Sequence, residues 1–193
     1  IIDNFSKDGT HNFIKTLKKK VIYRRIKNRG IIAKSRNLGI KIAKGKWICF
    51  LDSDDSWSDD KLKKTYDLIK INNFDLICND EWVEDKTYNT KKFWSYGPFE
   101  KNFYENLILF GNRNSTSASS VKKNFLINNK INFNEKKIFV TAEDYDFFLK
   151  IAFHGGVFHY LHEPLGTHVF HEKSESAKLT RLFKAQMNVL KFH

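Results

Sequence analysis

The sequence predicts an α/β domain in which helices cover a mixed, mainly parallel sheet. Short apolar runs alternate with longer amphipathic segments along the chain, which is the pattern of strands alternating with helices. The clearest run, residues 47–51, is continuously apolar, as expected of a strand covered on both faces. It ends abruptly in the polar residues 52–55, and ligands of open α/β sheets bind outside the carboxyl ends of such strands.

The first half of the chain predicts a strand end, a polar loop and then alternating helices and strands. In order, these are a strand end at 1–2, a loop at 3–10, helices at 11–19 and 31–43, and strands at 21–25 and 47–51. Gly45 follows the second helix and stops it. Ser58 is the expected cap of the next helix, which runs to Lys70 and has two aspartates in its first turn.

The second half continues the alternation after an irregular stretch. The expected strands lie at 75–79, 115–121 and 157–161, the expected helices at 102–110, 140–153 and 176–192, and the irregular stretch at 81–99. No Pro- or Gly-rich linker interrupts the chain of 193 residues, so we expect a single domain over 1–193. No apolar run approaches the ~18 residues of a membrane-spanning helix.

The net charge of +12 raises the question of an anionic partner. The basic residues are spread along the whole chain, so the charge favours anionic small molecules or an anionic membrane face over nucleic acid. The basic amphipathic helix at 176–192 is the segment that would lie on a membrane, or would simply be solvated. Cys49 and Cys78 sit in apolar runs without metal-ligand spacing, and we interpret them as reduced residues of a cytosolic protein.

The motif that carries chemistry is Asp52-Ser53-Asp54, at the end of the apolar run. In a turning loop this spacing can bring both carboxylates to one hard cation, and Mg²⁺ or Mn²⁺ takes such oxygen ligands. An Asp-rich loop with a helix cap explains the same residues equally well. Glu143 and Asp144 pose a similar choice, because acidic residues are favoured at any helix start.

Longer stretches around these residues resemble the family 2 glycosyltransferases, which are inverting enzymes of the GT-A (nucleotide-diphospho-sugar transferase) fold. The likeness covers the chain from Ile1 to about Ser176. It lies in residues 1–10, 28–30, 35–39, 43–47, 50–57, 60–62 and 142–152. Several motifs in the right order are more specific than one Asp-x-Asp. The likeness begins at the family's second strand, so we expect the first strand and helix to be missing and the chain to belong to a longer protein.

The resemblance implies a role for particular residues on the donor side. Asp54 matches the carboxylate that binds Mn²⁺ or Mg²⁺, and Asp52 would contact the donor ribose or reach the ion through water. Asp3 and Asn4 fall where the family contacts the nucleotide base, although an Asp is commoner at the second position. Arg36 would pair with the diphosphate or with the Asp cluster.

On the acceptor side the resemblance implies that Asp144 is the general base and that Glu143 contacts the acceptor or supports the base. His171 falls where some relatives place a histidine near the metal or the diphosphate. Residues 114–120 match an acceptor-side strand. Three tryptophans can stack on sugar rings or cover the core: Trp57, Trp82 and Trp94.

We therefore expect a metal-dependent inverting transfer of a sugar from a nucleotide-sugar, most simply a UDP-sugar, to a glycan or lipid-linked acceptor. Residues 1–80 would bind the donor, 81–175 would hold the acceptor and the base, and 176–193 would form the C-terminal helix. The setting would be polysaccharide, lipopolysaccharide or glycoprotein biosynthesis in the cytoplasm, with peripheral association at the inner face of the membrane as an option. A nucleotidyltransferase of similar fold and a non-catalytic nucleotide-sugar or glycan-binding module are the alternatives. Metal-dependent release of free nucleoside diphosphate would separate the enzyme from the binding module.

Overall fold

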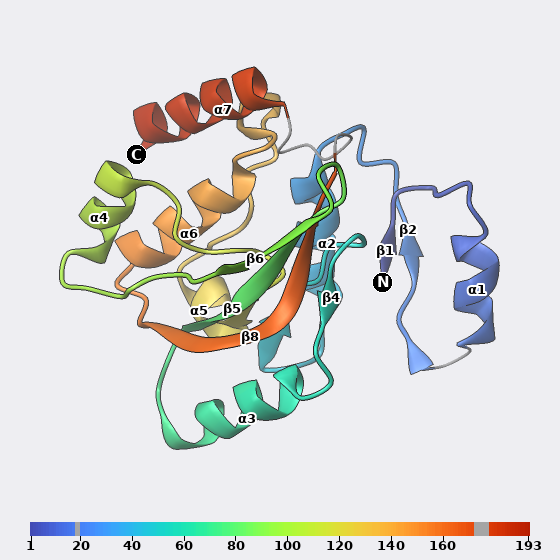
Figure 1. Ribbon diagram of the computed structural model, residues 1–193, viewed down its shortest axis with the longest axis horizontal. Coiled ribbons are helices and arrows are strands. Elements are labelled where there is room, and N and C mark those ends of the chain that lie inside the picture. Colours follow the sequence, from blue (N-terminus) through green and yellow to red (C-terminus); the bar gives the residue numbers. More distant parts are fainter. Residues whose placement is uncertain (18–19, 172–177) are drawn as a thin grey trace.

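The computed structural model describes residues 1–17, 20–171 and 178–193. Its main sheet has the strand order β3-β7-β5-β8-β4, and β6 pairs with β5 (Figure 1). The strands are β3 (Trp47–Cys49), β4 (Ser56–Trp57), β5 (Leu76–Asp85), β6 (Thr90–Trp94), β7 (Ser119–Lys122) and β8 (Phe158–Phe170). The long strands β5 and β8 form the centre on which the other strands are arranged.

The sheet is mixed, which confirms the α/β class, but the prediction that it is mainly parallel is wrong. Among the described strands of this main sheet, only β5 and β8 pair in parallel. The pairs β3–β7, β4–β8, β5–β6 and β5–β7 are antiparallel. One physical reason lies in the connection between β5 and β6, because a short hairpin permits only antiparallel pairing.

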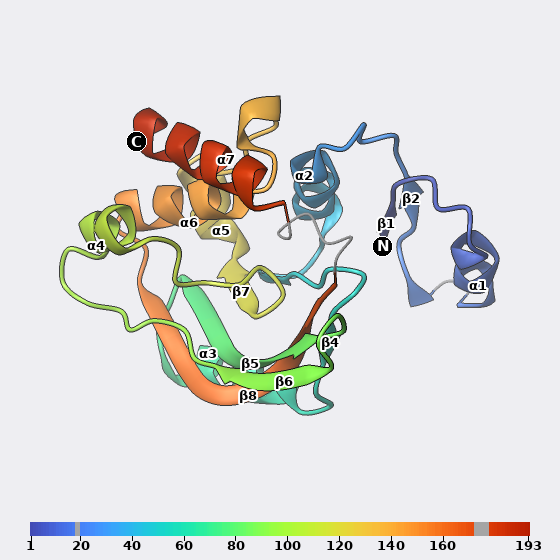
Figure 2. The same ribbon diagram turned by 45° about the horizontal axis from the view of Figure 1, so that its top comes forward.

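Helices cover both sides of this sheet. They are α2 (Ile32–Ile42), α3 (Lys61–Ile71), α4 (Phe103–Phe110), α5 (Lys123–Asn128), α6 (Glu143–Phe153) and α7 (Leu179–Phe192), with the 3₁₀ turn η2 (Lys137–Phe139) before α6. Figure 2 shows the curved sheet with α4, α6 and α7 on its concave side, and α3 lies away from them. This arrangement places the start of α6 above the sheet.

The core is centred on α6, whose apolar side chains are almost completely buried: Phe147, Phe148, Leu149 and Ile151. The ring of Phe147 stacks on Phe133 with 4.0 Å between centroids. Burying each such side chain stabilises the fold by roughly 1.5–3 kcal/mol, so α6 is a firm support for the residues at its first turn.

The N-terminal segment lies beside the main sheet (Figure 1). There β1 (Ile2–Asp3) and β2 (Arg24–Arg25) form a separate parallel pair, with α1 (Thr10–Thr16) between them in sequence. Asn4 connects this unit to the rest, because its Oδ1 accepts a hydrogen bond from Asn28 N at 3.0 Å and Asn28 Nδ2 donates to Ser35 Oγ at 3.0 Å. The segment is thereby attached to the first turns of α2.

The predicted elements agree with the structure apart from shorter ends, such as that of β7, which begins at Ser119 instead of 115, and apart from the following differences. The region 81–99 is not irregular, since it holds the end of β5 and all of β6, and β8 extends far beyond Leu161. The short elements β4 and α5 were not predicted. Ser58 does not cap α3, because its hydroxyl donates to Asp60 Oδ1 and Asp60 takes the cap position. The predicted helix ends at 18–19 and 176–177 lie outside the described residues.

Candidate active site

The segment that carries Asp52 and Asp54 crosses the sheet. It joins β3 and β4, which are the two outer strands of the order. The residues of β7 and its preceding loop hold it in place: Asp52 N donates to Ser117 Oγ at 3.0 Å, and Trp57 Nε1 donates to Ser117 O at 2.8 Å. The crossing segment therefore presents its aspartates above the middle of the sheet.

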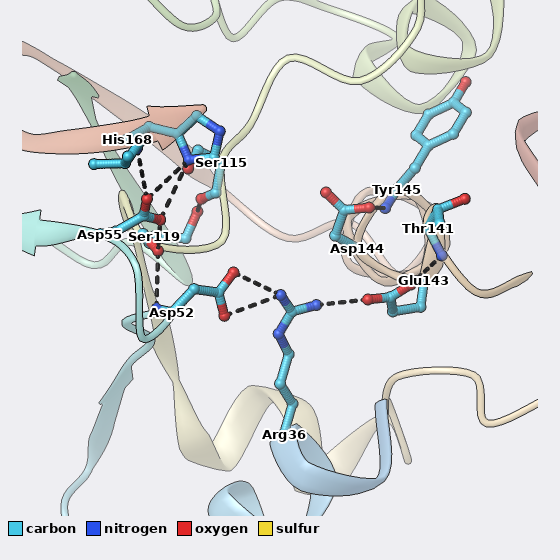
Figure 3. Close-up of polar contacts among 12 residues, drawn as sticks. Arg36, Asp52, Asp55, Ser115, Ser119, Thr141, Glu143, Asp144, Tyr145 and His168 are labelled. Carbon is cyan, nitrogen blue, oxygen red and sulfur yellow. Dashed lines mark hydrogen bonds and ion pairs between the residues drawn. The ribbon is translucent and has the colours of Figure 1, made fainter. Parts of the chain in front are cut away.

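Asp55 anchors this crossing segment, a role that the sequence analysis did not assign. Its side chain is 2% exposed and accepts hydrogen bonds from Ser117 Oγ at 2.6 Å and Val169 N at 2.9 Å. His168 Nδ1 lies 3.1 Å from Asp55 Oδ1 (Figure 3). Burial alone would raise the pKa of Asp55, but the contacts with His168 and Ser117 outweigh it and lower the pKa, so the carboxylate stays ionised.

Arg36 connects the crossing segment to the start of α6. Its guanidinium donates to both carboxylate oxygens of Asp52, at 2.8 and 3.1 Å, and to Glu143 Oε1 at 2.9 Å (Figure 3). The Arg36 side chain is 11% exposed, so these are strong, charge-assisted contacts. One cation thus holds together two carboxylates that lie far apart in the sequence.

The first turn of α6 is shaped by Glu143. Its second oxygen, Oε2, accepts a hydrogen bond from Thr141 N at 2.9 Å, while Oε1 receives Arg36. Thr141 has a φ of 87°, which is the left-handed region and costs a residue with a branched side chain free energy. The contact with Glu143 holds this strained residue and completes the hydrogen bonding of the buried Glu143 carboxylate.

Asp144 follows Glu143, and its surroundings change the pKa of its carboxylate. Its Oδ1 accepts from Tyr145 N at 2.8 Å, and Asn112 Nδ2 lies 3.4 Å from its Oδ2. Loss of contact with water and the neighbouring charge of Glu143 raise the pKa of Asp144 to about 6, although the Arg36 cation opposes them. A carboxylate with such a pKa can accept a proton near neutral pH.

Asp54 and His171 lie close together where the crossing segment approaches the end of β8. His171 Nε2 lies 3.6 Å from Asp54 Oδ2, and both side chains are partly exposed. No three His, Cys, Asp or Glu side chains converge on a common point within residues 1–17, 20–171 and 178–193. Two protein ligands nevertheless fit Mg²⁺ or Mn²⁺, which usually completes its shell with waters and substrate phosphates. Asp52 does not join this pair, because Arg36 holds it.

The predicted base-contacting residues lie apart from this cluster. Asp3 is buried, and its carboxylate accepts hydrogen bonds from Ser6 N at 2.9 Å, Tyr23 Oη at 2.7 Å and Arg25 Nε at 3.0 Å. Burial alone would raise the pKa of Asp3, but these contacts outweigh it and hold the pKa well below its usual range. Both Asp3 and Asn4 fix the local backbone in this structure.

A buried lysine contacts residues that neighbour the crossing segment. Lys61, at the start of α3, is fully buried and donates to Asn79 Oδ1 and, at 3.0 Å, to Ala118 O. Its ammonium lies 5.2 Å from the ring of Trp57, so Trp57 belongs to the packing around α3. The family-like stretch 60–62 contains Lys61, but its sequence gave no sign that this cation turns inward.

Three comparisons place the chain among known proteins. The profile of the family described as "Glycosyl transferase family 2" matches residues 1–133. The chain is 35% identical to the poly(ribitol-phosphate) beta-N-acetylglucosaminyltransferase TarP of Staphylococcus aureus over 149 residues, which are 75% of this chain and 44% of TarP. It is 27% identical to a cholesterol galactosyltransferase of Borreliella burgdorferi over 135 residues, 66% of this chain and 36% of that protein.

The fold is similar to that of a solved structure. The crystal structure of S. aureus TarS 1–349 in complex with UDP-GlcNAc superposes with a TM-score of 0.70 at 18% identity, covering 92% of this chain and 50% of that chain. The match confirms the expected GT-A architecture. The chain spans about half the length, or less, of the relatives described here.

Proposed function

Since the chain belongs to glycosyltransferase family 2, we propose that it transfers a sugar from a UDP-sugar to a hydroxyl of a polymeric acceptor, with inversion at the anomeric carbon. The observation that supports this most strongly is the Arg36 bridge. It joins the crossing segment, on the proposed donor side, to the helix start that carries the proposed base. UDP-GlcNAc is the donor to test first, because it is bound in the TarS structure and TarP transfers N-acetylglucosamine by name.

Asp144 is the proposed general base. In the transfer, the acceptor hydroxyl oxygen bonds to the anomeric carbon of the sugar, its proton passes to the Asp144 carboxylate, and UDP leaves with the electrons of the broken carbon–oxygen bond. The raised pKa, to about 6, supports this role because the carboxylate is ionised at neutral pH and still basic enough to take the proton. Glu143 keeps the first turn of α6 in place through Arg36 and Thr141.

Asp54 and His171 are the proposed ligands of Mn²⁺ or Mg²⁺. When bound, such an ion neutralises the charge that develops on the leaving diphosphate. Asp52 and Arg36 would orient the ribose and the diphosphate, and Asp3 and Asn4 would shape the base pocket. The proximity of Asp54 to His171 supports the first assignment, and the others rest on family resemblance.

We also propose a peripheral location at the inner face of a membrane. The described part of the chain contains no helix long and apolar enough to cross a bilayer. In α7, Leu179 and Phe183 are strongly exposed and Met187 is partly exposed, and their spacing puts them on one stripe. Lysines 184 and 191 lie beside the stripe, which is the composition of a helix that binds an anionic lipid surface.

The test of the proposed function is release of UDP from UDP-GlcNAc, measured with Mn²⁺, with Mg²⁺ and with EDTA. Acceptors are ribitol-phosphate oligomers and N-acetylglucosamine oligosaccharides. We expect metal-dependent release that Asp54→Ala abolishes and His171→Ala reduces, while both variants keep the wild-type melting temperature because the two side chains are partly exposed. Wild-type turnover by Asp54→Ala would contradict the assignment of Asp54 and His171 as metal ligands. Donor binding without any UDP release would favour a binding module.

A further inference from the structure

Strand β6 presents two different surfaces. Its residues pair with β5 so that Trp94 lies opposite Glu81 and Lys92 opposite Val83. Directly opposed residues of antiparallel strands project from the same face of the sheet. Trp94, Lys92, Glu81 and Val83 therefore share one face.

This shared face is the one that lies under the crossing segment. Val83 is also the register partner of His168 on β8, and His168 contacts Asp55 of the crossing segment. Glu81 is fully buried, and its Oε2 receives a hydrogen bond from Tyr96 Oη at 2.9 Å. Trp94 and Lys92 thus continue, on the exposed strand β6, the same face that supports the candidate active site.

Neighbouring residues of the chain, joined by hydrogen bonds, lead from Trp94 toward Asp144. The segment just after Trp94 is fixed by Asp80, which accepts from Tyr96 N at 2.9 Å. Gly97 N donates to Arg113 O at 3.3 Å, and the neighbouring Asn112 reaches Asp144 Oδ2 at 3.4 Å. Residues 95–97 and 112–113 lie between Trp94 and Asp144. Trp94 would therefore contact a unit of the acceptor other than the one that reacts.

The exposure of Trp94 is unusual for a tryptophan. The residue is 54% exposed, and β6 has no buried residue. Large aromatic side chains left in water beside a reactive centre commonly mark a binding surface. The adjacent Lys92 and the net charge of +12 fit a ligand that carries negative charge.

The opposite face of β6 supplies a natural comparison. There Phe93 lies opposite Trp82 and Lys91 opposite Glu84. Phe93 and Trp82 are in edge-to-face contact at 5.8 Å, and the Lys91 ammonium lies 5.3 Å from the Trp82 ring. The same strand therefore carries an aromatic–lysine pair on each face, and only one of these faces continues into the site.

We propose that Trp94 and Lys92 form an acceptor subsite for an anionic glycan or polyol-phosphate polymer. The Trp94 ring stacks on a sugar or polyol unit, and the Lys92 ammonium pairs with a phosphate or carboxylate of the polymer. The proposal rests on the proposed function, since it assigns the place where the acceptor extends away from Asp144.

The experiment follows the indole N–H signals of the ¹⁵N-labelled protein by NMR while ribitol-phosphate oligomers, or neutral chitotetraose, are added. Tryptophan-to-phenylalanine variants assign the signals. We expect the oligomers to shift the Trp94 signal and to leave that of Trp82 in place. Trp94→Ala and Lys92→Ala should each weaken oligomer binding by about 2- to 10-fold without changing UDP-GlcNAc binding. Phe93→Ala and Lys91→Ala are the matched controls and should bind as the wild type does.

The outcomes separate the subsite from the proposed function. A Trp94 signal that responds to neither probe, or only to chitotetraose, overturns the anionic acceptor subsite. Equal losses of oligomer binding in Phe93→Ala and Lys91→Ala overturn it as well, because the two faces of β6 would then contribute equally to binding. Wild-type protein that does not bind UDP-GlcNAc would reject the proposed function, whereas donor binding with a silent Trp94 signal rejects the subsite alone.

Discussion

Asp144 is held between opposing electrostatic influences. Burial and the charge of Glu143 raise its pKa to about 6, and Arg36 acts in the other direction. If Asp144 is the base, kcat/KM should rise with pH through an apparent pKa near 6 as the carboxylate ionises. Glu143→Gln removes the like charge, so this acid limb should move to lower pH. Measuring kcat/KM between about pH 5 and pH 8 checks both expectations, and a limb that does not move would contradict the coupling.

The same pKa predicts an effect on stability that does not depend on activity. The folded-state pKa of Asp144, about 6, is above the ordinary value of 3.8, so ionisation favours the unfolded chain. Asp144→Asn should therefore melt at a higher temperature than the wild type at pH 7. The gain should shrink as the pH falls from about 6 and vanish below about 3.8.

Thermal unfolding at several pH values measures this difference. Asp59→Asn is the control, because Asp59 is an exposed carboxylate that lies just before α3. The control should show no gain at any pH. A melting temperature of Asp144→Asn equal to or below that of the wild type at pH 7 would show that the surroundings of Asp144 do not destabilise its ionised form.

At the scale of elements, the crossing segment between β3 and β4 depends on Asp55. Asp55→Ala leaves Ser117 Oγ and Val169 N without their acceptor, and should lower the free energy of unfolding by about 3 kcal/mol. Asp55→Asn keeps one acceptor oxygen and should cost less. Urea denaturation of the three proteins gives the values, and a loss under about 0.5 kcal/mol for Asp55→Ala would mean that the segment is held elsewhere.

Helix α7 carries its own prediction. Replacing Leu179 and Phe183 by Ser should reduce co-sedimentation with vesicles of anionic phosphatidylglycerol, and added salt should weaken wild-type binding. The matched control replaces Leu109 and Phe110 on α4 by Ser, since they are about as exposed but belong to another helix. Equal losses in both double variants, or no binding by the wild type, would contradict membrane binding through α7.

The elements differ in how far the sequence could predict them. The predicted strand 47–51 and helix 140–153 have strong local patterns, and the structure contains them as the shorter elements β3 and α6. Strand β6 was missed because all of its residues are exposed, so it lacks the alternation of buried and exposed positions that marks a strand. The far end of β8 was missed because polar residues such as His162 and Thr167 interrupt the apolar pattern after Leu161, whereas pairing with β5 and β4 extends the strand.

At the scale of the whole molecule, the candidate site is assembled by contacts that no local pattern contains. The order of motifs drew attention to Arg36, Asp52 and Asp144 as candidate site residues. Pairing of Arg36 with the Asp cluster was one of the expected alternatives, and the structure contains it as the contact with Asp52. The contact of Arg36 with Glu143, 107 positions away, was not predicted, because it depends on how the fold places α2 and α6. Asp55 was overlooked for the same reason, since its partners on β8 lie more than 100 positions away.

In the proposed function, this cluster binds a UDP-sugar and Asp144 removes the proton of the acceptor hydroxyl. The most direct measurement compares wild type and Asp144→Asn for UDP-GlcNAc affinity by calorimetry and for UDP release in the presence of an acceptor. We expect equal affinity and a fall in turnover of roughly 10²- to 10⁴-fold, because an amide keeps the shape but accepts no proton. Weakened donor binding with unchanged turnover per bound donor would contradict the claim and make Asp144 a binding residue.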